Sequence, residues 1–205
     1  EIWFGTNNGP ETDARASYTR YYQYVGSVMQ NKKCREHIKG IAFQWAGKFA
    51  IAQAAEDYPE VAFIHSEGEC GDGNNTWDYA MYTYEMYHHY FKNGARANVY
   101  WNMALDNDGL SSWGWRQNSL ISVKNGEYRY NPELYLVKHF AKFVKRGAVM
   151  LATTGDFSSN TTVFENADGS RVAIIVNPFG FEKTVSLENT SYTLKPRSFN
   201  TIVLD

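Results

Sequence analysis

Residues 61–73 read Val-Ala-Phe-Ile-His-Ser-Glu-Gly-Glu-Cys-Gly-Asp-Gly, an apolar run of β-forming residues that ends abruptly in carboxylates and glycines. Because strand side chains alternate between two faces, Phe63, His65 and Glu67 share one face. A buried strand that runs directly into Glu, Asp and Gly is typical of a barrel strand that carries a reactive group at its C-terminal rim. The same pattern also fits a surface loop after a buried strand.

Strand-like and helix-like segments alternate four times before Gly147. Strands are expected at residues 2–6, 38–45, 61–67 and 97–102, and helices at about 12–30, 50–55, 76–93 and 132–147. Capping signals support two of the helices: Asn75 or Thr76 suits an N-cap, Gly94 suits C′, and Pro132 suits the first helical position. This alternation indicates an α/β fold built of βα units with parallel strands.

Four βα units are half of a closed (β/α)8 TIM barrel, which needs eight. Four parallel strands also fit an open sheet, but the first strand begins at Ile2 with no strand before it. We therefore expect residues 1–147 to be the second half of a TIM barrel, strands five to eight. Short segments with period-two character follow, at 162–165, 171–177, 183–187 and 200–204, with a tight turn at Asp168-Gly169. Residues 148–205 are therefore expected to form an antiparallel β-sandwich portion.

Composition excludes several classes of partner. The formal net charge is −2 and there is no long run of like charge, so the sequence has no electrostatic footprint for nucleic acid or anionic membranes. No apolar run approaches the length of a membrane span. Aromatic residues make up 16% of the chain. Flat rings with a polar edge suit the C–H faces of sugars, although an aromatic-rich core gives the same composition.

No motif calls for a cofactor or a metal. The two cysteines are not spaced as a zinc or redox motif, and His88-His89 are adjacent rather than at the i, i+4 spacing of ligand pairs. The loop that starts at Asp106 resembles the start of a calcium loop, but Gln117 stands where the bidentate Glu would be. Three Asn-X-Ser/Thr triplets favour an extracellular or secreted protein, with a periplasmic or lysosome-like compartment as alternatives.

The C-terminal ends of the expected strands bring a distinctive set of side chains to one rim. The set consists of one carboxylate, two amides and two large rings, on Glu67, Gln44, Asn102, Trp45 and Trp101. Rings stack on sugars, amides bind hydroxyl groups, and a retaining glycosidase uses two carboxyl groups roughly 5–5.5 Å apart.

The polar loop after the fourth strand adds Trp113 and Trp115 as candidate sugar platforms. Packing of these two rings under the loop is the alternative. His65, on the strand that carries Glu67, is expected to be a packed histidine rather than a catalytic base.

Three motifs resemble glycoside hydrolase family 30, the glucosylceramidase-like family that also holds microbial β-1,6-glucanases and β-xylosidases. They are Phe-Gln-Trp-Ala-Gly-Lys at 43–48, Ser-Glu-Gly-Glu-Cys-Gly-Asp-Gly-Asn-Asn-Thr-Trp at 66–77, and Val-Tyr-Trp-Asn-Met at 99–103. The resemblance extends over nearly the whole chain. It implies a (β/α)8 barrel with a side β-sandwich and retaining hydrolysis of β-glycosides.

On this resemblance Glu67 is the nucleophile, on the seventh barrel strand, and Glu69 is the rival carboxylate. Gln44 and Trp45 would end the sixth strand, and Trp101 and Asn102 the eighth. The implied substrate is a β-linked glucan or glucoside, such as a β-1,6-glucan or a glucosylceramide-like molecule.

The chain departs from the family at the acid/base, which is the Glu of an Asn-Glu pair. No Asn-Glu dipeptide occurs in the 205 residues. We therefore expect a C-terminal half that is inactive on unactivated glycosides by itself and whose partner is an N-terminal half-barrel chain or segment. The sequence leaves two alternatives: a non-catalytic carbohydrate-binding fragment, and a subunit whose edge strands at 2–6 and 97–102 pair with a complementary chain.

Overall fold

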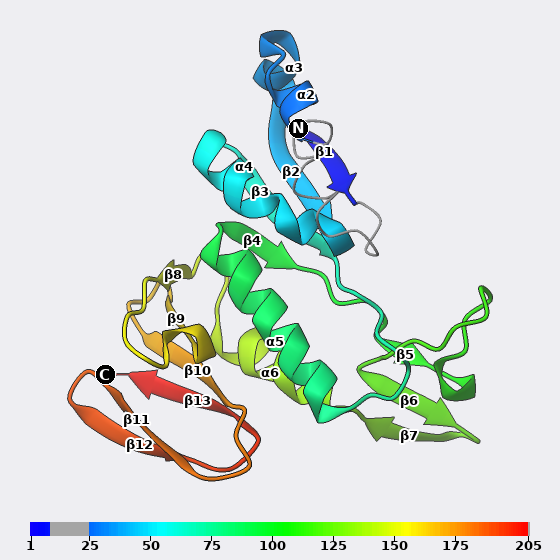
Figure 1. The fold of residues 1–205 in the computed structure, drawn as a ribbon, viewed down its shortest axis with the longest axis vertical. Coiled ribbons are helices and arrows are strands. Elements are labelled where there is room, and N and C mark those ends of the chain that lie inside the picture. Colours follow the sequence, from blue (N-terminus) through cyan, green and yellow to red (C-terminus); the bar gives the residue numbers. More distant parts are fainter. Residues whose placement is uncertain (9–24, 205) are drawn as a thin grey trace. The chain divides into compact units, whose positions relative to one another are not determined.

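The computed structural model describes residues 1–8 and 25–204. The chain divides into two compact units (Figure 1). The first unit contains Glu1–Glu69 and His89–Trp101, and the second contains Cys70–His88 and Asn102–Asp205. Most of the helix expected at 12–30 lies outside the described residues.

The first unit is built on a parallel four-stranded sheet with the strand order β1-β2-β3-β4. Its elements are β1 (Ile2–Asn7), α2 (Ser27–Met29), α3 (Lys32–His37), β2 (Ile38–Gln44), the 3₁₀ helix η2 (Trp45–Phe49), α4 (Ile51–Asp57), β3 (Ala62–Glu67) and β4 (Ala95–Asn98). Ile41, Phe43 and Phe63 of the sheet are buried, as are Met29 and Ile51 of the helices. This pattern is expected for parallel strands with both faces covered. The parallel sheet predicted from the sequence is therefore confirmed.

The fourth strand was predicted at 97–102, but β4 ends at Asn98. The reason is a register shift between β3 and β4 beyond Phe63. The Val99 amide donates to the His65 carbonyl at 2.9 Å, and the Gly68 amide donates to the Val99 carbonyl at 2.7 Å. These two backbone hydrogen bonds keep Val99 against the end of β3, although Val99 lies outside the regular strand β4.

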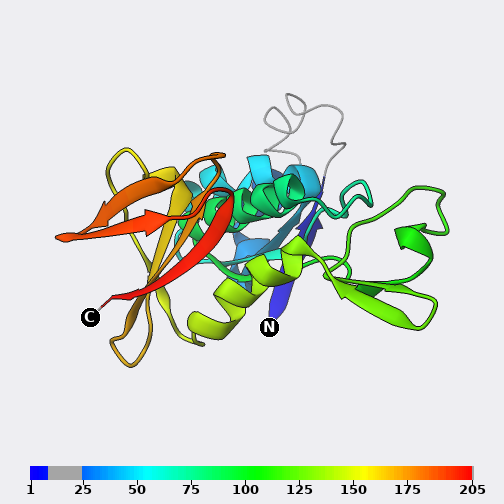
Figure 2. The same ribbon diagram turned by 90° about the horizontal axis from the view of Figure 1, so that it is seen from below.

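The second unit combines two helices with antiparallel strands. Helix α5 (Trp77–Lys92, of which residues 77–88 belong to this unit) and helix α6 (Pro132–Phe143) lie side by side (Figure 2). The Phe140 ring contacts those of Tyr84 and Tyr87, with centroids 6.3 Å and 5.1 Å apart. The predicted caps are confirmed: Thr76 Oγ1 accepts from the Tyr79 amide, and Pro132 stands at the start of α6.

The sandwich portion contains a four-stranded antiparallel sheet of order β13-β10-β9-β8 and a two-stranded ribbon β11-β12. The strands are β8 (Val149–Leu151), β9 (Thr161–Glu165), β10 (Arg171–Asn177), β11 (Lys183–Leu187), β12 (Thr190–Leu194) and β13 (Ser198–Leu204), with the short 3₁₀ helix η4 (Ser158–Asn160) before β9. Gly169 has a φ of +82° in the turn between β9 and β10, as the Asp168-Gly169 signal predicts.

A third sheet lies in the segment that the sequence analysis treated as a long polar loop. It consists of β5 (Ala104–Leu105), β6 (Ile121–Lys124) and β7 (Glu127–Tyr130), with the 3₁₀ helix η3 (Asn107–Gly109). The β6–β7 hairpin turns at Asn125 and Gly126, whose φ values are +53° and +81°. Asn-Gly between two strands is the common two-residue hairpin turn, so this signal was present in the sequence and was missed.

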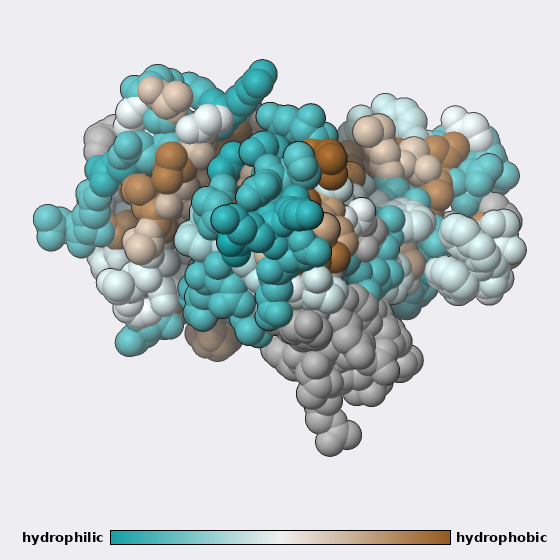
Figure 3. Space-filling view, turned by 90° about the horizontal axis from the view of Figure 1, so that it is seen from above, coloured by the Kyte–Doolittle hydropathy of each residue, from teal (hydrophilic) through white to brown (hydrophobic). Residues whose placement is uncertain are grey.

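None of the described helices is long and apolar enough to cross a membrane. On the face of the molecule shown in Figure 3, hydrophobic residues occur in scattered groups among hydrophilic ones. Single exposed apolar residues are normal on a folded protein, so this face gives no reason to assign a docking surface.

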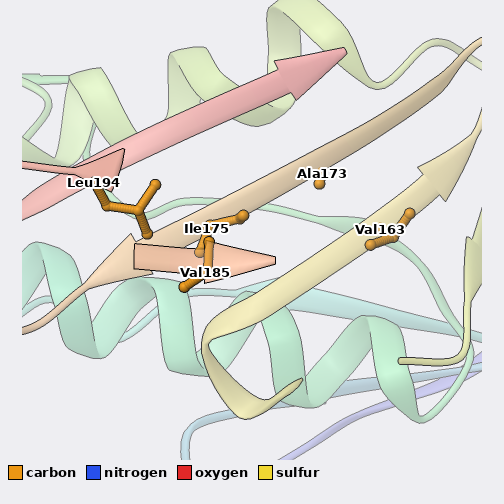
Figure 4. Close-up of a cluster of buried hydrophobic side chains, with 5 residues drawn as sticks. All are labelled: Val163, Ala173, Ile175, Val185 and Leu194. Carbon is orange, nitrogen blue, oxygen red and sulfur yellow. The ribbon is translucent and has the colours of Figure 1, made fainter. Parts of the chain in front are cut away.

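The core of the sandwich portion forms around β10, which is buried on both faces. Ala173 and Ile175 point toward Val163 of β9 and toward Val185 and Leu194 of the β11-β12 ribbon (Figure 4). The alternate residues Val172, Ile174 and Val176 are also buried, on the other face of the sheet. On that face Tyr84 of α5 hydrogen-bonds through its hydroxyl group to the Ile174 carbonyl oxygen at 3.2 Å. A strand covered on both faces explains the unbroken apolar run Val-Ala-Ile-Ile-Val.

Candidate active site

Strand β3 brings Glu67 to the carboxyl end of the parallel sheet. Phe63 and His65 are buried along the strand, and Glu67, its last residue, is half-buried. In the strand register Glu67 pairs with Gln44, the last residue of β2. Two of the residues predicted for the site therefore lie next to each other at the edge where parallel sheets place reactive groups.

Trp45 follows Gln44 directly and begins η2. Its indole Nε1 donates a hydrogen bond of 2.8 Å to Oε1 of Glu67. The Trp45 backbone has a φ of +45°, a region that non-glycine residues rarely occupy. No other hydrogen bond of the Glu67 side chain occurs within the described residues, so Oε2 is left for another partner.

Lys48 lies three residues after Trp45 on the same 3₁₀ helix, and its Nζ is 2.5 Å from Oε1 of Glu69. The side chains of this ion pair are only 15% and 13% exposed. The Lys48 carbonyl oxygen is also 2.8 Å from Nε2 of His89. The spacing of Lys48 and Glu69 in the sequence does not indicate this contact, so the pair was not predicted.

His65 is packed into the sheet rather than free to act as a base. Its ring stacks on Tyr90, with centroids 3.9 Å apart and planes at 11°. Its Nδ1 hydrogen-bonds to Oδ1 of Asn98. Burial disfavours the imidazolium and lowers the pKa of His65 from 6.5 to about 4. The expectation of a packed histidine is confirmed.

Trp101 lies beside the segment that follows β3. A Cβ atom at Gly68 would be 3.4 Å from the Trp101 amide nitrogen and from the Val99 carbonyl oxygen. The backbone at Trp101, whose side chain is half-buried, therefore lies against the residue that directly follows Glu67.

Three other predicted site residues, Asn102, Trp113 and Trp115, belong to the second unit. Asn102 donates through Nδ2 to Oε1 of Gln117 at 3.1 Å and to the Asn118 carbonyl at 3.2 Å, so its amide donor is engaged within the loop. The Trp113 and Trp115 rings stack on each other, with centroids 5.4 Å apart and planes at 17°. They are 64% and 48% exposed, so the alternative that they pack under the loop is wrong.

A buried carboxyl group that the sequence analysis did not identify lies at the start of α6. Glu133 has no solvent exposure, and Oε1 accepts a 2.8 Å hydrogen bond from Asn118. Asn118 in turn accepts from the amides of Gly73 at 2.7 Å and Asn75 at 3.3 Å. Burial is the main cause that raises the pKa of Glu133 to about 7. This network holds the loop that follows Cys70.

No cluster of three or more His, Cys, Asp or Glu suited to a metal ion occurs in residues 1–8 and 25–204. Glu67 accepts a hydrogen bond from Trp45, and Glu69 accepts one from Lys48. The chemistry that the arrangement supports is that of an oriented carboxylate without a metal ligand set.

Known proteins resemble this chain over part of their length. Endo-1,6-beta-D-glucanase BGN16.3 of Trichoderma harzianum is 30% identical over 110 residues, which are 49% of this chain and 22% of that protein. The crystal structure of SrfJ from Salmonella typhimurium matches 91% of this chain and 45% of its own, at a TM-score of 0.77 and 22% identity. The catalytic domain of GH30 xylanase C from Talaromyces cellulolyticus matches 98% of this chain and 51% of its own, at a TM-score of 0.68 and 17% identity. No family model matches the chain.

The chain resembles glycoside hydrolase family 30 proteins in sequence over part of its length and in fold. It spans about half of each of the two solved chains described above. The α/β fold, a parallel sheet followed by antiparallel sheets, therefore matches about half of a family 30 structure. The resemblance to this family that the three sequence motifs indicate is confirmed.

Proposed function

We propose that this chain carries the nucleophile of a retaining β-glycosidase and that Glu67 is this nucleophile. The observation that carries the proposal is the 2.8 Å hydrogen bond from the Trp45 indole to Oε1 of Glu67 at the carboxyl end of β3. A hydrogen bond to the ionised form favours the carboxylate that must attack the anomeric carbon. The donor fixes one oxygen and leaves the other for the attack.

The Lys48–Glu69 ion pair favours Glu67 over Glu69 as the nucleophile. Glu69 is nearly buried against a cation at 2.5 Å, so attack by its carboxylate would require this pair to break. Breaking one partner out of a buried pair leaves an uncompensated charge, which is costly. Within the part of the chain that the structure describes, Glu67 accepts from the neutral Trp45 indole and needs no such rearrangement.

For the substrate we propose β-glucosidic linkages, in a β-1,6-glucan or a glucosylceramide-like molecule. The Trichoderma relative, an endo-1,6-beta-D-glucanase by name, supports the first of these. In this proposal Gln44 and Asn102 bind sugar hydroxyl groups, Trp101 borders the reactive subsite, and Trp113 and Trp115 present a ring platform. The exposure of the last two rings supports that role.

The acid/base carboxyl group is proposed to come from an N-terminal half-barrel chain or segment outside these 205 residues. No Asn-Glu pair occurs in the sequence. Strands β1 and β4 are the edges of the parallel sheet within the described residues, as a half-barrel that pairs with its complement requires. Without general-acid help an unactivated glycoside would be hydrolysed about 10²–10⁴-fold more slowly.

Covalent trapping with 2-deoxy-2-fluoro-β-glucosyl fluoride tests the nucleophile, because fluoride leaves with little acid assistance. We expect peptide mass spectrometry of the intact protein, as its source makes it, to find the label on Glu67. Glu67→Gln should abolish labelling, whereas Glu60→Gln, at an exposed position, should retain it. Label on Glu69 instead, or label that persists in Glu67→Gln, would contradict the assignment.

A non-catalytic carbohydrate-binding role is the second candidate, and the exposed stacked pair Trp113 and Trp115 favours it. The two functions differ in their dependence on Glu67. A binding module would bind β-1,6-glucan oligosaccharides equally well with Glu67→Gln and would take up no label. Labelling of Glu67 excludes this alternative.

A further inference from the structure

Strand β7 presents two exposed tyrosine side chains on one face of the β5-β6-β7 sheet (Figure 1). Tyr128 and Tyr130 are 67% and 47% exposed, and alternate residues of a strand project from the same face. Their ring centroids are 5.4 Å apart and their planes are at 46°. Tyr135 of the following helix α6 is 50% exposed. Three large rings are thus left uncovered within eight residues of the chain.

The hydroxyl groups of these tyrosines interact with one another. Interaction with the Tyr128 hydroxyl is the main cause that raises the pKa of Tyr130, and the charge of Tyr135 acts in the same direction. Tyr130 therefore keeps its proton at neutral pH and can both donate and accept a hydrogen bond. Within residues 1–8 and 25–204, none of the three hydroxyl groups is hydrogen-bonded to a group outside this cluster.

The tyrosine-bearing face of the β6–β7 hairpin carries no charged residue. In the register of the hairpin, the two tyrosines of β7 pair with apolar residues of β6, Ile121 and Val123. The charged residues alternate with these positions and project from the other face; they are Lys124, Glu127 and Arg129. On that other face Nζ of Lys124 lies 3.2 Å from Oδ1 of Asp108. The two faces of the hairpin therefore differ in chemistry.

A neutral face of rings and hydroxyl groups suits a particular class of ligand. Nucleic acids and anionic lipids bind through cations, which this face of the hairpin lacks. A wholly apolar partner would bury the tyrosine hydroxyl groups without hydrogen bonds, which is costly. A sugar can place its C–H face on a ring and exchange hydrogen bonds between its own hydroxyl groups and those of tyrosine. The face therefore fits a neutral carbohydrate.

We propose that Tyr128, Tyr130 and Tyr135 form a second carbohydrate-binding surface, the tyrosine surface, whose ligand is a neutral β-glucan. The name of the Trichoderma relative, an endo-1,6-beta-D-glucanase, supports a β-1,6-glucan. This inference rests on the proposed β-glucan substrate and is independent of the role of Glu67. The tyrosine surface holds the polymer and has no part in the chemical step.

Affinity electrophoresis of the intact protein, in gels that contain a β-1,6-glucan polymer, tests the tyrosine surface. Binding is measured in the Glu67→Gln background, so that the polymer is not cleaved. Tyr128→Ala and Tyr130→Ala should each raise the dissociation constant roughly two- to tenfold, because each removes one aromatic contact. Both side chains are exposed, so the melting temperature should stay at the wild-type value.

Two matched variants control for side effects of the substitutions. Arg129→Ala alters the same strand on its opposite face, and Phe181→Ala removes a ring that is 61% exposed between β10 and β11. Both should keep the wild-type affinity. An equal loss of affinity in Arg129→Ala would show that a disturbed strand, rather than the tyrosine surface, causes the effect. Wild-type affinity in Tyr128→Ala, Tyr130→Ala and Tyr135→Ala would overturn the proposal.

Two further measurements separate this proposal from its alternatives. If light scattering finds a dimer that Tyr128→Ala dissociates while glucan affinity is unchanged, the face joins two copies of the chain and the proposal is wrong. Labelling of Glu67 by the small fluoroglucoside, in the wild-type background, tests the proposed nucleophile separately. If Glu67 takes up no label but the tyrosine variants bind glucan less tightly, the tyrosine surface stands and the nucleophile fails. If the polymer does not retard the protein at all, the tyrosine surface and the proposed substrate are both wrong.

Discussion

The indole nitrogen of Trp45 lies 2.8 Å from Oε1 of Glu67, and the residue that makes this bond has a φ of +45°. A non-glycine residue in this left-handed region costs of order 1–3 kcal/mol and persists only where the surrounding structure holds it. The unusual backbone of Trp45 turns the chain from β2 into η2 and brings the ring to the neighbouring strand. The strain is thus located where the proposed chemistry needs a fixed donor.

Trp45→Phe should keep the ring packing and remove the donor. A hydrogen bond to a charged group contributes about 1.5–3 kcal/mol, which corresponds to a labelling rate roughly 10- to 100-fold lower. The rate of trapping of Glu67 at saturating probe measures this. Trp3→Phe, in β1 of the same unit, is the control and should label at the wild-type rate. An unchanged rate in Trp45→Phe would show that the indole does not support the nucleophile.

Glu133 should make the second unit less stable as the pH rises. Its folded pKa is about 7 against an ordinary value of 4.5, so the folded state holds the proton more tightly than the unfolded state. The free energy of unfolding should therefore fall between pH 4.5 and 7, by up to about 3 kcal/mol, and change no further above pH 7 from this group.

Glu133→Gln should remove that fall and leave the Asn118 contact in place. Urea unfolding at several pH values, monitored by hydrogen exchange in residues 102–204, measures how the free energy of unfolding changes with pH. Glu127→Gln, at an exposed position of β7, should keep the wild-type slope. A Glu133→Gln variant with the wild-type slope would contradict the prediction.

His65 should have the opposite effect on the first unit. The unfolded histidine takes up a proton below pH 6.5, whereas the folded one, with a pKa of about 4, does not. Stability should therefore be lost as the pH falls from 6.5 to 4, by up to about 3 kcal/mol. The pH dependence of stability due to His65 has the opposite sign to that due to Glu133. The stability of the wild-type protein as a function of pH would therefore contain both effects.

His65→Phe keeps a ring on Tyr90 and removes the titration. We expect lower stability at pH 7.5, because the Asn98 contact is lost, but a flatter profile between pH 4 and 6.5. His37→Phe, at an exposed position of α3, should leave the profile as in the wild type. Equal slopes in His65→Phe and the wild type would exclude His65 as the acid-sensitive group.

Trp113→Ala and Trp115→Ala should weaken binding of β-1,6-glucan oligosaccharides without loss of stability. Each ring stacks on the other and is largely exposed, so each offers one outer face to a sugar. An aromatic contact of about 0.5–1.5 kcal/mol corresponds to roughly two- to tenfold in affinity, which calorimetry can measure.

Trp77→Ala is the matched control for those variants. Trp77 stacks on Phe199 and is covered by Arg197, whose guanidinium lies 4.6 Å from the ring centroid. Its loss should lower the melting temperature and leave glucan affinity as in the wild type. If Trp113→Ala and Trp115→Ala instead lower stability and keep the wild-type glucan affinity, the proposal that the two rings bind sugar is wrong.

The local order of the residues determined most of the elements. The apolar run before Glu67 predicts β3, the run from Val172 to Val176 predicts β10, and Pro132 marks the start of α6. These signals are local, because periodicity, β-branched side chains and capping residues act on neighbouring positions. The three motifs around Trp45, Glu67 and Trp101 also indicated the resemblance to family 30 from the sequence alone.

Tertiary structure decided which of these residues meet and in what state. The end of β4 at Asn98 depends on its register with β3, and the Lys48–Glu69 pair depends on the turn of η2. Glu133 looks like an ordinary acidic residue in a first helical turn, yet in the fold it is buried beside Asn118. Burial and long-range pairing come from segments distant in the chain, so no local pattern carries them. The sequence alone therefore predicted Glu67 as the candidate nucleophile, whereas the donors that contact Glu67 and Glu69 became visible only in the folded chain.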